Sequence, residues 1–531
     1  TTEIYTLSLH DALPIWVYTL DSGFGVCEAF AVKDGRILQT GTSAEILEKY
    51  PGIQGYDLGG KFVYPGFMDA HCHFYGLGEG LVRWADLRGA ASMEEVIDRL
   101  KAFHEQFPQL WLLGRGWDQN RFPDKQFPDK ELLDKHFPDI PVFLVRIDGH
   151  TALANTMALD MAGMDTARKI EGGEAVIRQG KLTGLLIDNA KEMVSEILPA
   201  LEDSLKIKAL LKAQETCFSK GLTRICDAGL PASMIHLIRN AQENGQLKIP
   251  MVVMLNPDEE SLSAILDRGI LKTDRLLVNS VKLYADGALG SRGALLLEPY
   301  SDAPGEYGLR VIHPEEFRRV CRRAEQTGFQ VCTHAIGDSA NRYVLEIYAE
   351  FLKPGNDKRW RIEHAQVVDS GDLQRFGENG IIPSVQPTHA TSDMYWAAER
   401  LGPGRLRQAY AYKDLLNQNG WMPLGTDFPI EEVSPLLTFY AAIFRKDMSG
   451  WPEDGFQTEN SLNRREALYG MTLWAAKASF LENETGSLEP GKWADFVVLD
   501  TDLMVADPDA IRIASVLQTW VMGENVYQQT R

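Results

Sequence analysis

Two patterns of hydrophobic residues alternate along the middle of the chain. Short runs rich in apolar and β-branched residues are separated by segments long enough for a helical crossover. Eight such runs are expected to be strands, at residues 62–68, 221–227, 249–255, 280–286, 330–334, 360–364, 381–386 and 422–427. Strands that alternate with helices predict an α/β fold with a parallel sheet. Eight of them predict a (β/α)8 barrel, which we assign to residues 62–479.

The interval between the first and second predicted strands is too long for one crossover. It covers residues 76–211 and therefore predicts an inserted subdomain. Phe-Pro-Asp occurs three times in it, at residues 122–124, 127–129 and 137–139. These triplets are typical of turns, since Pro fixes φ and Asp turns the chain, and their irregular spacing argues against a repeat architecture.

Both ends of the chain show the pattern of β structure. Residues 30–38 carry an Asp-Gly pair between two apolar runs, which predicts a hairpin. Near the other end, residues 495–499, 515–521 and 523–527 are also strand-like. We therefore expect residues 16–61 and 480–531 to build one small β-sandwich that flanks the barrel.

Residues 1–15 differ in character from the rest of the chain. Their sequence is the translation, in one frame, of a widely used short-read sequencing adapter. We expect this segment not to be native and exclude it from reasoning about the fold. The native first strand is then expected to be missing, together with any signal peptide or lipoprotein cysteine.

Composition limits the classes of protein to consider. A chain of 531 residues with 44% hydrophobic residues exceeds one ordinary core and implies at least two domains. A net charge of −20 without a basic run argues against a nucleic-acid partner. Six cysteines, several inside apolar strands, indicate buried thiols, and no apolar run approaches a membrane span of about 18 residues. A cytoplasmic location is the expectation.

The candidate chemistry begins with two histidines at the end of the first predicted barrel strand. An extended strand points His71 and His73 to the same face, where both can bind one cation. Alone, such a pair is more often solvated than bound to metal. The context strengthens the metal interpretation, because Lys282, His334, His364 and Asp427 follow near the ends of predicted strands four, five, six and eight. In a (β/α)8 barrel these ends carry the chemistry.

The order His-x-His, Lys, His, His, Asp resembles the amidohydrolase superfamily. Residues 64–73, 285–292 and 491–496 resemble in particular the branch with N-substituted formamide deformylases and YtcJ-like proteins. The resemblance runs from about Trp16 to the C-terminus and is much less specific for substrate than for superfamily. It implies a metal-dependent hydrolase, with the 76–211 insertion over the barrel mouth as a lid or specificity element.

The resemblance also implies a binuclear centre. The six positions are His71, His73 and Asp427 for one cation, His334 and His364 for the other, and Lys282 between them. Zinc is the default for imidazole and carboxylate ligands, although manganese, iron or cobalt also suit them. Two cations about 3.5 to 4 Å apart turn a shared water into hydroxide, which attacks a carbonyl. Asp427 is then the expected proton acceptor and donor, with a purely structural ligand as the alternative.

Lys282 needs a chemical reason to be a ligand, because a protonated ammonium has no lone pair for a metal. Reaction with carbon dioxide would give a carbamate whose two oxygens can bridge two cations, as in the binuclear members of the superfamily. The alternative is an ammonium inside the barrel that pairs with Asp286 or Asp427.

Six further residues are weaker candidates for substrate binding. They are His150 and Trp117 in the insertion, Asp286 and Arg292 after the fourth strand, and Gln386 and His389 after the seventh. Four of them have a plainer explanation: packing for Trp117, a structural role for His150, and a loop-holding salt bridge for Asp286 and Arg292.

Three functions fit the pattern. The first is a hydrolase of non-peptide carbon–nitrogen bonds that acts on a small-molecule amide such as an N-formyl or N-acyl amine. The second is a mononuclear deaminase of a nitrogenous base, a group that typically has Glu three residues after the strand-five histidine, where this chain has Gly337. The third is a non-catalytic metal-binding barrel, which predicts a lost ligand, whereas none of the six is lost. The oligomeric state stays open, a homodimer being one candidate.

Overall fold

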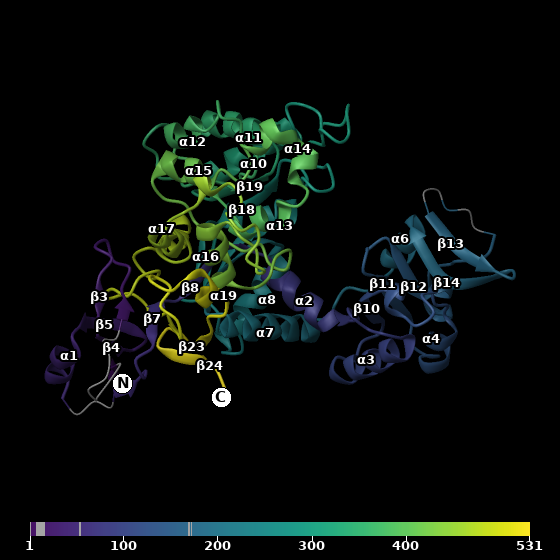
Figure 1. Cartoon of the computed structure of the whole chain (residues 1–531), viewed down its shortest axis with the longest axis horizontal. Helices are drawn as coiled ribbons and strands as arrows, with labels where there is room; N and C mark the ends of the chain where they lie inside the picture. The colour runs from purple at the N-terminus through teal and green to yellow at the C-terminus, as the bar shows by residue number, and fades with distance from the viewer. Residues whose placement is uncertain (1, 7–15, 52–54, 168–169, 171–172, 531) are drawn as a thin grey trace. The chain divides into compact units, whose positions relative to one another are not determined.

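The computed structural model describes residues 2–6, 16–51, 55–167, 170 and 173–530. The chain divides into two compact units (Figure 1). One comprises residues 1–74 and 214–531, and the other comprises Tyr75–Ala213. Helices α2 (Phe74–Arg83) and α7 (Asp203–Ser219) contain the two boundaries. Within the described residues, no helix has the length and apolar character that crossing a bilayer requires.

The larger unit contains a barrel of parallel strands, as the sequence predicted. Seven strands follow one another in the order β21-β20-β19-β18-β16-β15-β8, and each neighbouring pair is parallel. Their bounds are Phe67–Cys72 for β8, Leu222–Leu230 for β15, Met251–Leu255 for β16, Leu276–Tyr284 for β18, Gln330–Ala335 for β19, Arg361–His364 for β20 and Ile382–Ser384 for β21. β18 is buried along all but its last residue, as expected for a strand covered on both faces.

The eighth predicted strand, residues 422–427, closes the barrel without forming a regular strand. On one side the backbone N–H of Gly425 donates to the carbonyl of Val385, after β21, at 3.0 Å. On the other side the N–H of Ala70 in β8 donates to the carbonyl of Leu424 at 3.2 Å. Pro423 has no N–H to donate, which shortens the ladder. The segment therefore bonds to both edge strands and completes the ring.

The first predicted strand, residues 62–68, was wrong as one element. Phe62–Pro65 forms β7, which pairs with β2 and β22 of the sandwich, and the barrel strand β8 begins at Phe67. Gly66 separates them: a Cβ at this position would lie 2.2 Å from the side chain of Thr223. Only glycine allows this close approach, at the point where the chain passes from one sheet to the other.

Helices cover the outside of the barrel, in the βα order that the spacing predicted (Figure 1). They include α8 (Ala232–Glu243), α10 (Pro314–Thr327), α11 (Asp338–Phe351), α12 (Gln374–Asn379), α13 (Pro387–Asp393), α14 (Ala397–Leu406), α15 (Tyr412–Asn419), α16 (Pro435–Phe444), α17 (Arg464–Gly470) and α18 (Leu473–Ala478). Apolar side chains of β8, β15, β16 and β19 fill part of the interior.

The two ends of the chain form a β-sandwich together, which confirms the predicted fold. One sheet has the order β5-β4-β1-β6 and the other β24-β23-β22-β7-β2-β3, so purple N-terminal strands and yellow C-terminal strands lie together (Figure 1). The strands are β1 (Thr2–Thr6), β2 (Trp16–Tyr18), β3 (Val26–Cys27), β4 (Ala29–Lys33), β5 (Arg36–Gly41), β6 (Gly55–Asp57), β22 (Phe496–Leu499), β23 (Val516–Val521) and β24 (Glu524–Gln528). Phe30, Val63 and Phe496 belong to its core.

Two local features of the sandwich bear on the sequence predictions. The hairpin of β4 and β5 turns at Asp34 and Gly35, which have φ of 51° and 77°, so the predicted Asp-Gly turn is confirmed. Strand β1 lies within the segment expected to be non-native, and residues 7–15 of that segment are outside the described residues. Strand pairing uses the backbone alone, so the origin of this segment stays a prediction.

The smaller unit is a six-stranded sheet covered on both faces (Figure 1). Its order is β13-β14-β12-β11-β10-β9, with bounds Gly173–Arg178, Lys181–Asp188, Thr151–Ala154, Val142–Arg146, Leu112–Trp117 and Trp84–Asp86. Leu112 and Leu144 pack with helices α3 (Met93–Gln106) and α4 (Glu131–His136). Leu113 and Phe143 pack on the opposite face with α5 (Thr156–Met161) and α6 (Asn189–Ser195), as strand alternation requires.

Candidate metal centre

The side chains expected at the metal centre all lie at the carboxyl ends of the barrel strands. The positions are His71 and His73 at the end of β8, Lys282 in β18, His334 in β19, His364 at the end of β20 and Asp427 at the end of the closing segment. His73 and His334 are partly exposed, and the others are buried. The barrel topology thus brings together residues that are more than 350 positions apart in the sequence.

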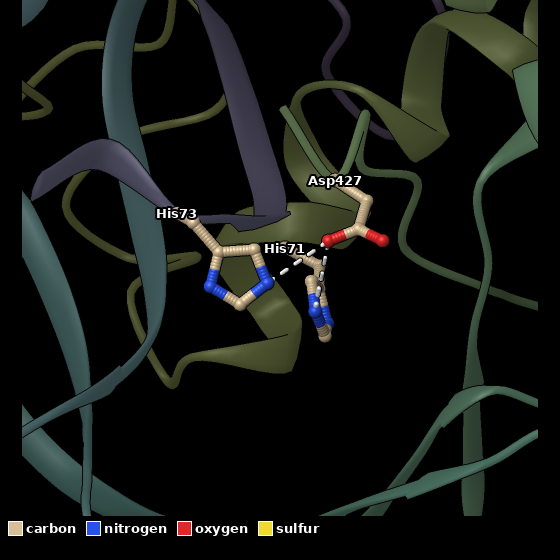
Figure 2. Close-up of side chains that lie close together, drawn as sticks. All are labelled: His71, His73 and Asp427. Atoms are coloured by element: carbon tan, nitrogen blue, oxygen red, sulfur yellow. Dashed lines mark ion pairs between the residues drawn. The ribbon is translucent and has the colours of Figure 1, made fainter. Parts of the chain in front are cut away.

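His71, His73 and Asp427 converge on one point (Figure 2). Oδ1 of Asp427 lies 3.1 Å from Nε2 of His73 and 3.6 Å from Nε2 of His71. Zinc bonds of about 2.1 Å place tetrahedral donor atoms about 3.4 Å apart. The separations in this group therefore suit three ligands of one cation.

Glu363 fixes the ring of His71. Its Oε2 lies 2.6 Å from Nδ1 of His71, and both side chains are fully buried. A carboxylate only accepts, so Nδ1 carries the proton and Nε2 keeps its lone pair on the side of Asp427. Burial, and then the charge of Lys282, lower the pKa of His71 to about 4, so that its ring is neutral near pH 7.

Asp69 in β8, the first barrel strand, forms hydrogen bonds to the closing segment, residues 422–427, beside this group. Its Oδ1 accepts the backbone N–H groups of His71 and Thr426, each at 3.1 Å, and its Oδ2 accepts the Thr426 hydroxyl at 2.7 Å. The N–H of Asp427 donates to the carbonyl of His71 at 2.8 Å. Burial raises the pKa of Asp69 to about 7, despite these bonds. The clamp holds His71 and Asp427 in register.

A second group of three ligand atoms comprises His364, His389 and Asp427. Nδ1 of His364 donates to Oε1 of Gln386 at 2.7 Å, which leaves Nε2 free for a ligand role. Nε2 of His389 lies 3.5 Å from Oδ2 of Asp427. Gln386 and His389 were weaker candidates for substrate binding. In the structure Gln386 contacts a candidate metal ligand, and His389 is among the candidate ligands.

Positive φ angles set the side-chain directions of His364 and Asp427. His364 has φ of 73° and Asp427 has φ of 62°, a conformation that residues other than glycine adopt rarely. Each residue ends a strand or the closing segment, where the turn redirects its side chain. Such strained positions cluster at functional sites in proteins.

Lys282 is buried and makes no ion pair with a carboxylate within 4.0 Å among the described residues. Its Nζ lies 3.3 Å from Nε2 of His71. Burial lowers the pKa of Lys282, although Glu363 and Asp427 oppose the shift. The ammonium alternative requires an ion pair with Asp286 or Asp427, and the described residues do not form one.

His334 lies beside His364, with ring centroids 4.6 Å apart. Its Nε2 is 3.6 Å from Oδ1 of Asp286. Burial and the charge of Lys282 lower the pKa of His334 to about 3. A neutral imidazole beside Lys282 is the form that a metal ligand requires.

The residues present suit a divalent cation. Nε2 of His334, Nε2 of His389 and Oδ1 of Asp427 are buried and have no hydrogen-bond partner among the described residues. Burial alone would raise the pKa of Asp427, yet the imidazoles of His73, His71 and His364 hold it well below the usual value. Buried polar atoms are nearly always paired, so a group of unpaired imidazole and carboxylate atoms fits a bound metal.

Asp286 and Arg292 make contacts that hold loops, though not with each other. Asp286 accepts backbone N–H groups of Leu295, Ile336 and Gly337 at 2.8, 3.0 and 2.8 Å. Burial raises the pKa of Asp286 to about 7. Arg292 pairs with Asp302 at 2.9 Å. These contacts favour a role in holding the loop after β18 over a role in substrate binding.

The two candidates in the insertion belong to the smaller unit. Trp117 is 1% exposed, and its indole N–H donates to the carbonyl of Leu144 at 2.9 Å, so its place in the core contradicts a pocket-lining role. The ring of His150 is exposed, and its Nδ1 lies 2.9 Å from Oδ1 of Asp188.

Sequence reasoning missed three residues around the site. Glu363, Arg361 and Asp69 are buried charged groups inside strands. Nε of Arg361 lies 2.8 Å from Oε1 of Glu363, which in turn holds His71. The available signal was the presence of charged residues within apolar runs, since buried charges are almost always paired. All six cysteines are free thiols, and five of them are buried, as the sequence predicted for cysteines inside apolar strands.

Comparisons with known proteins agree with this architecture. A sequence model of the Amidohydrolase family matches residues 54–527. The YtcJ amidohydrolase of Bacillus subtilis is 32% identical over 528 residues, 97% of this chain and 98% of that protein. N-substituted formamide deformylase of Arthrobacter pascens is 25% identical over 541 residues, 97% of each chain. The crystal structure of an uncharacterized metal-dependent hydrolase from Pyrococcus furiosus is 29% identical with a TM-score of 0.80, over 95% of this chain and 100% of that one.

Proposed function

The chain belongs to the amidohydrolase family of metal-dependent hydrolases, and from this premise we propose that it hydrolyses a non-peptide carbon–nitrogen bond in a small amide. The observation that carries the proposal is the group of His71, His73, His364 and Asp427 with Lys282 at the strand ends. Similarity to a formamide deformylase supports N-formyl amines as the first substrates to test, followed by other N-acyl amines.

We propose that His71, His73 and Asp427 hold one metal ion and that His334 and His364 contribute to holding a second, with zinc as the expected metal. A bound divalent metal lowers the pKa of coordinated water to near neutrality and polarises a carbonyl oxygen. Glu363 and Gln386 orient the rings of His71 and His364 so that each presents Nε2.

Lys282 is proposed to bridge the two positions as a carbamate. Its neutral amine would attack carbon dioxide, forming an N–C bond and releasing one proton to leave an anionic carbamate. Burial favours the neutral amine, because it lowers the pKa of Lys282. The absence of a carboxylate within 4.0 Å of Nζ, among the described residues, leaves the nitrogen uncommitted to an ion pair.

Asp427 is proposed to move the proton. Its pKa is held well below the usual value, since the surrounding imidazoles outweigh burial, so the carboxylate is ionised and can accept a proton from the attacking water. Returning that proton to the departing nitrogen lets an amine leave instead of an amide anion. The same residue then serves as ligand and as acid–base group.

The two other functions have weaker support. Deaminases of this fold typically have Glu where this chain has Gly337. A Cβ at Gly337 would lie 2.0 Å from the carbonyl oxygen of Leu295, so no larger side chain fits there. A non-catalytic barrel predicts loss of a ligand or of the base, and all six positions are kept.

The insertion is proposed to act as a lid or specificity element, and the cytoplasmic location and a homodimer stay predictions.

The catalytic proposal is tested by incubating the zinc-loaded chain with a panel of N-formyl and N-acetyl amines and measuring released formate or acetate. Release by the wild type but not by Asp427→Asn supports the proposal. Release of ammonia from amino-substituted bases, with no amide hydrolysis, favours the deaminase.

A further inference from the structure

His389 is the one histidine of the site that the resemblance to the superfamily does not assign to a metal. It lies in the first turn of α13, three residues after Gln386. We propose that His389 is a further ligand of the second metal position, so that the two oxygens of Asp427 face two cations. The inference rests on the proposed function only in requiring two metal positions at the site.

The two oxygens of Asp427 face different histidines. Oδ1 lies 3.6 and 3.1 Å from Nε2 of His71 and His73, whereas Oδ2 lies 3.5 Å from Nε2 of His389. His364 shares the group of Asp427 and His389, in which the ligand atoms lie within 4.8 Å of one another. A carboxylate placed in this way can bind one cation through each oxygen.

The contact between His389 and Asp427 is not a hydrogen bond. Nε2 of His389 is buried and has no hydrogen-bond partner among the described residues, and the separation of 3.5 Å is long for a direct bond. It is close to the spacing of about 3.4 Å that two donors have around one zinc ion. The gap between the two atoms is therefore better explained by a shared cation than by a weak ion pair.

The ring of His389 is held in place by its helix and by His364. The ring planes of His389 and His364 are 20° apart, with centroids separated by 5.8 Å. At the end of the same helix, Oδ2 of Asp393 accepts the Tyr410 hydroxyl at 2.9 Å and the Gln366 amide at 3.1 Å. Pro387, Thr388 and Ala390 are buried. A ligand on an anchored helix needs little ordering when metal binds.

The segment after the seventh barrel strand, β21, therefore contributes two residues to the proposed second metal position. Gln386 fixes the proton on Nδ1 of His364, and His389 supplies a nitrogen of its own three residues later. His334 remains beside His364 and can complete the position from the other side. The proposed second position is therefore built from the ends of strands five, six, seven and eight.

The test is a cobalt titration of the metal-free full chain, followed by absorption spectroscopy and by counting bound ions. The wild type is expected to bind two ions. His389→Ala is expected to keep the first and to bind the second more than about 100-fold more weakly, because even residues behind the ligands change affinity by 10 to 100-fold. Added imidazole is expected to restore the second ion. The control His236→Ala changes an exposed histidine of α8 and should bind as wild type does.

Unchanged binding of both ions by His389→Ala would overturn the inference, as would a single ion bound equally by wild type and variant. A raised KM with unchanged metal binding would assign His389 to substrate instead. His389→Gln keeps the side chain's bulk, and equal melting temperatures of the metal-free proteins verify folding. The titration uses no substrate, so failure of the amide hydrolase proposal would not affect it.

Discussion

Glu363 and His71 form a buried pair at the base of the candidate metal centre, with Oε2 and Nδ1 separated by 2.6 Å. Arg361 reaches the other carboxylate oxygen at 2.8 Å. Burial alone would raise the pKa of Glu363, but the charge of Arg361 and the hydrogen bond from His71 lower it to about 2. The carboxylate is therefore ionised and makes His71 a stronger ligand.

Replacing Glu363 with Gln is expected to weaken metal binding by about 10 to 100-fold, because partners of metal ligands typically contribute that much. Competition with a coloured chelator measures the affinity. Glu350→Gln, which removes an exposed pair with Arg318, is the matched control and should have no effect. Equal affinity in wild type and Glu363→Gln would show that His71 needs no such partner.

Asp427→Asn is expected to reduce kcat at least about 100-fold, since general acid–base catalysis contributes between 10² and 10⁴. The variant keeps an oxygen that can bind metal, so the measurement pairs kcat with metal content. Asp454→Asn changes an exposed carboxylate and should retain wild-type kcat. Wild-type kcat in Asp427→Asn would assign Asp427 a purely structural role.

Asp69→Ala is expected to lower the free energy of unfolding by at least about 1–3 kcal/mol, because it leaves buried backbone and hydroxyl donors unpaired. Those donors are the His71 and Thr426 N–H groups and the Thr426 hydroxyl. Urea denaturation of the metal-free protein measures the change. Asp57→Ala removes an exposed hydrogen bond from the Gly59 N–H and should lower the free energy of unfolding much less. A similar loss in both variants would refute the clamp.

Metal removal is expected to destabilise the native chain. A metal present at 1,000 times its dissociation constant contributes about 4 kcal/mol to the free energy of unfolding. Thermal unfolding with and without chelator measures the shift in Tm. The shift should be smaller in His71→Ala, which lacks a ligand. An equal shift in both proteins would place the stabilising metal elsewhere.

The order of motifs along the chain was enough to predict the barrel and six candidate ligands. Parallel strands converge at their carboxyl ends, so His71, Lys282 and Asp427 had to lie near one another once each was placed on a strand. The break at Gly66 was missed because a strand-like run does not reveal which sheet its residues join. The close approach of Thr223 to Gly66 at the break is visible only in three dimensions.

The surroundings of the ligands were less predictable. His389 reaches Asp427 from a helix turn, and His364 is aimed by a φ of 73°, so neither orientation follows from strand alternation. Trp117 was a weak candidate for the pocket, with packing as the plainer explanation, because a tryptophan near glycine fits both. Its buried hydrogen bond to the carbonyl of Leu144 shows that it belongs to the core of the smaller unit.

Lys282 is proposed to take part in a metal centre that hydrolyses amides. The most direct measurement counts metal ions per chain in wild type and Lys282→Ala, alongside hydrolysis of N-formyl and N-acetyl amines. Lys353→Ala, at an exposed position, is the control. We predict two ions in the wild type, one or none in Lys282→Ala, and loss of activity in parallel. One ion in both proteins, with hydrolysis retained in Lys282→Ala, would exclude Lys282 from the metal centre.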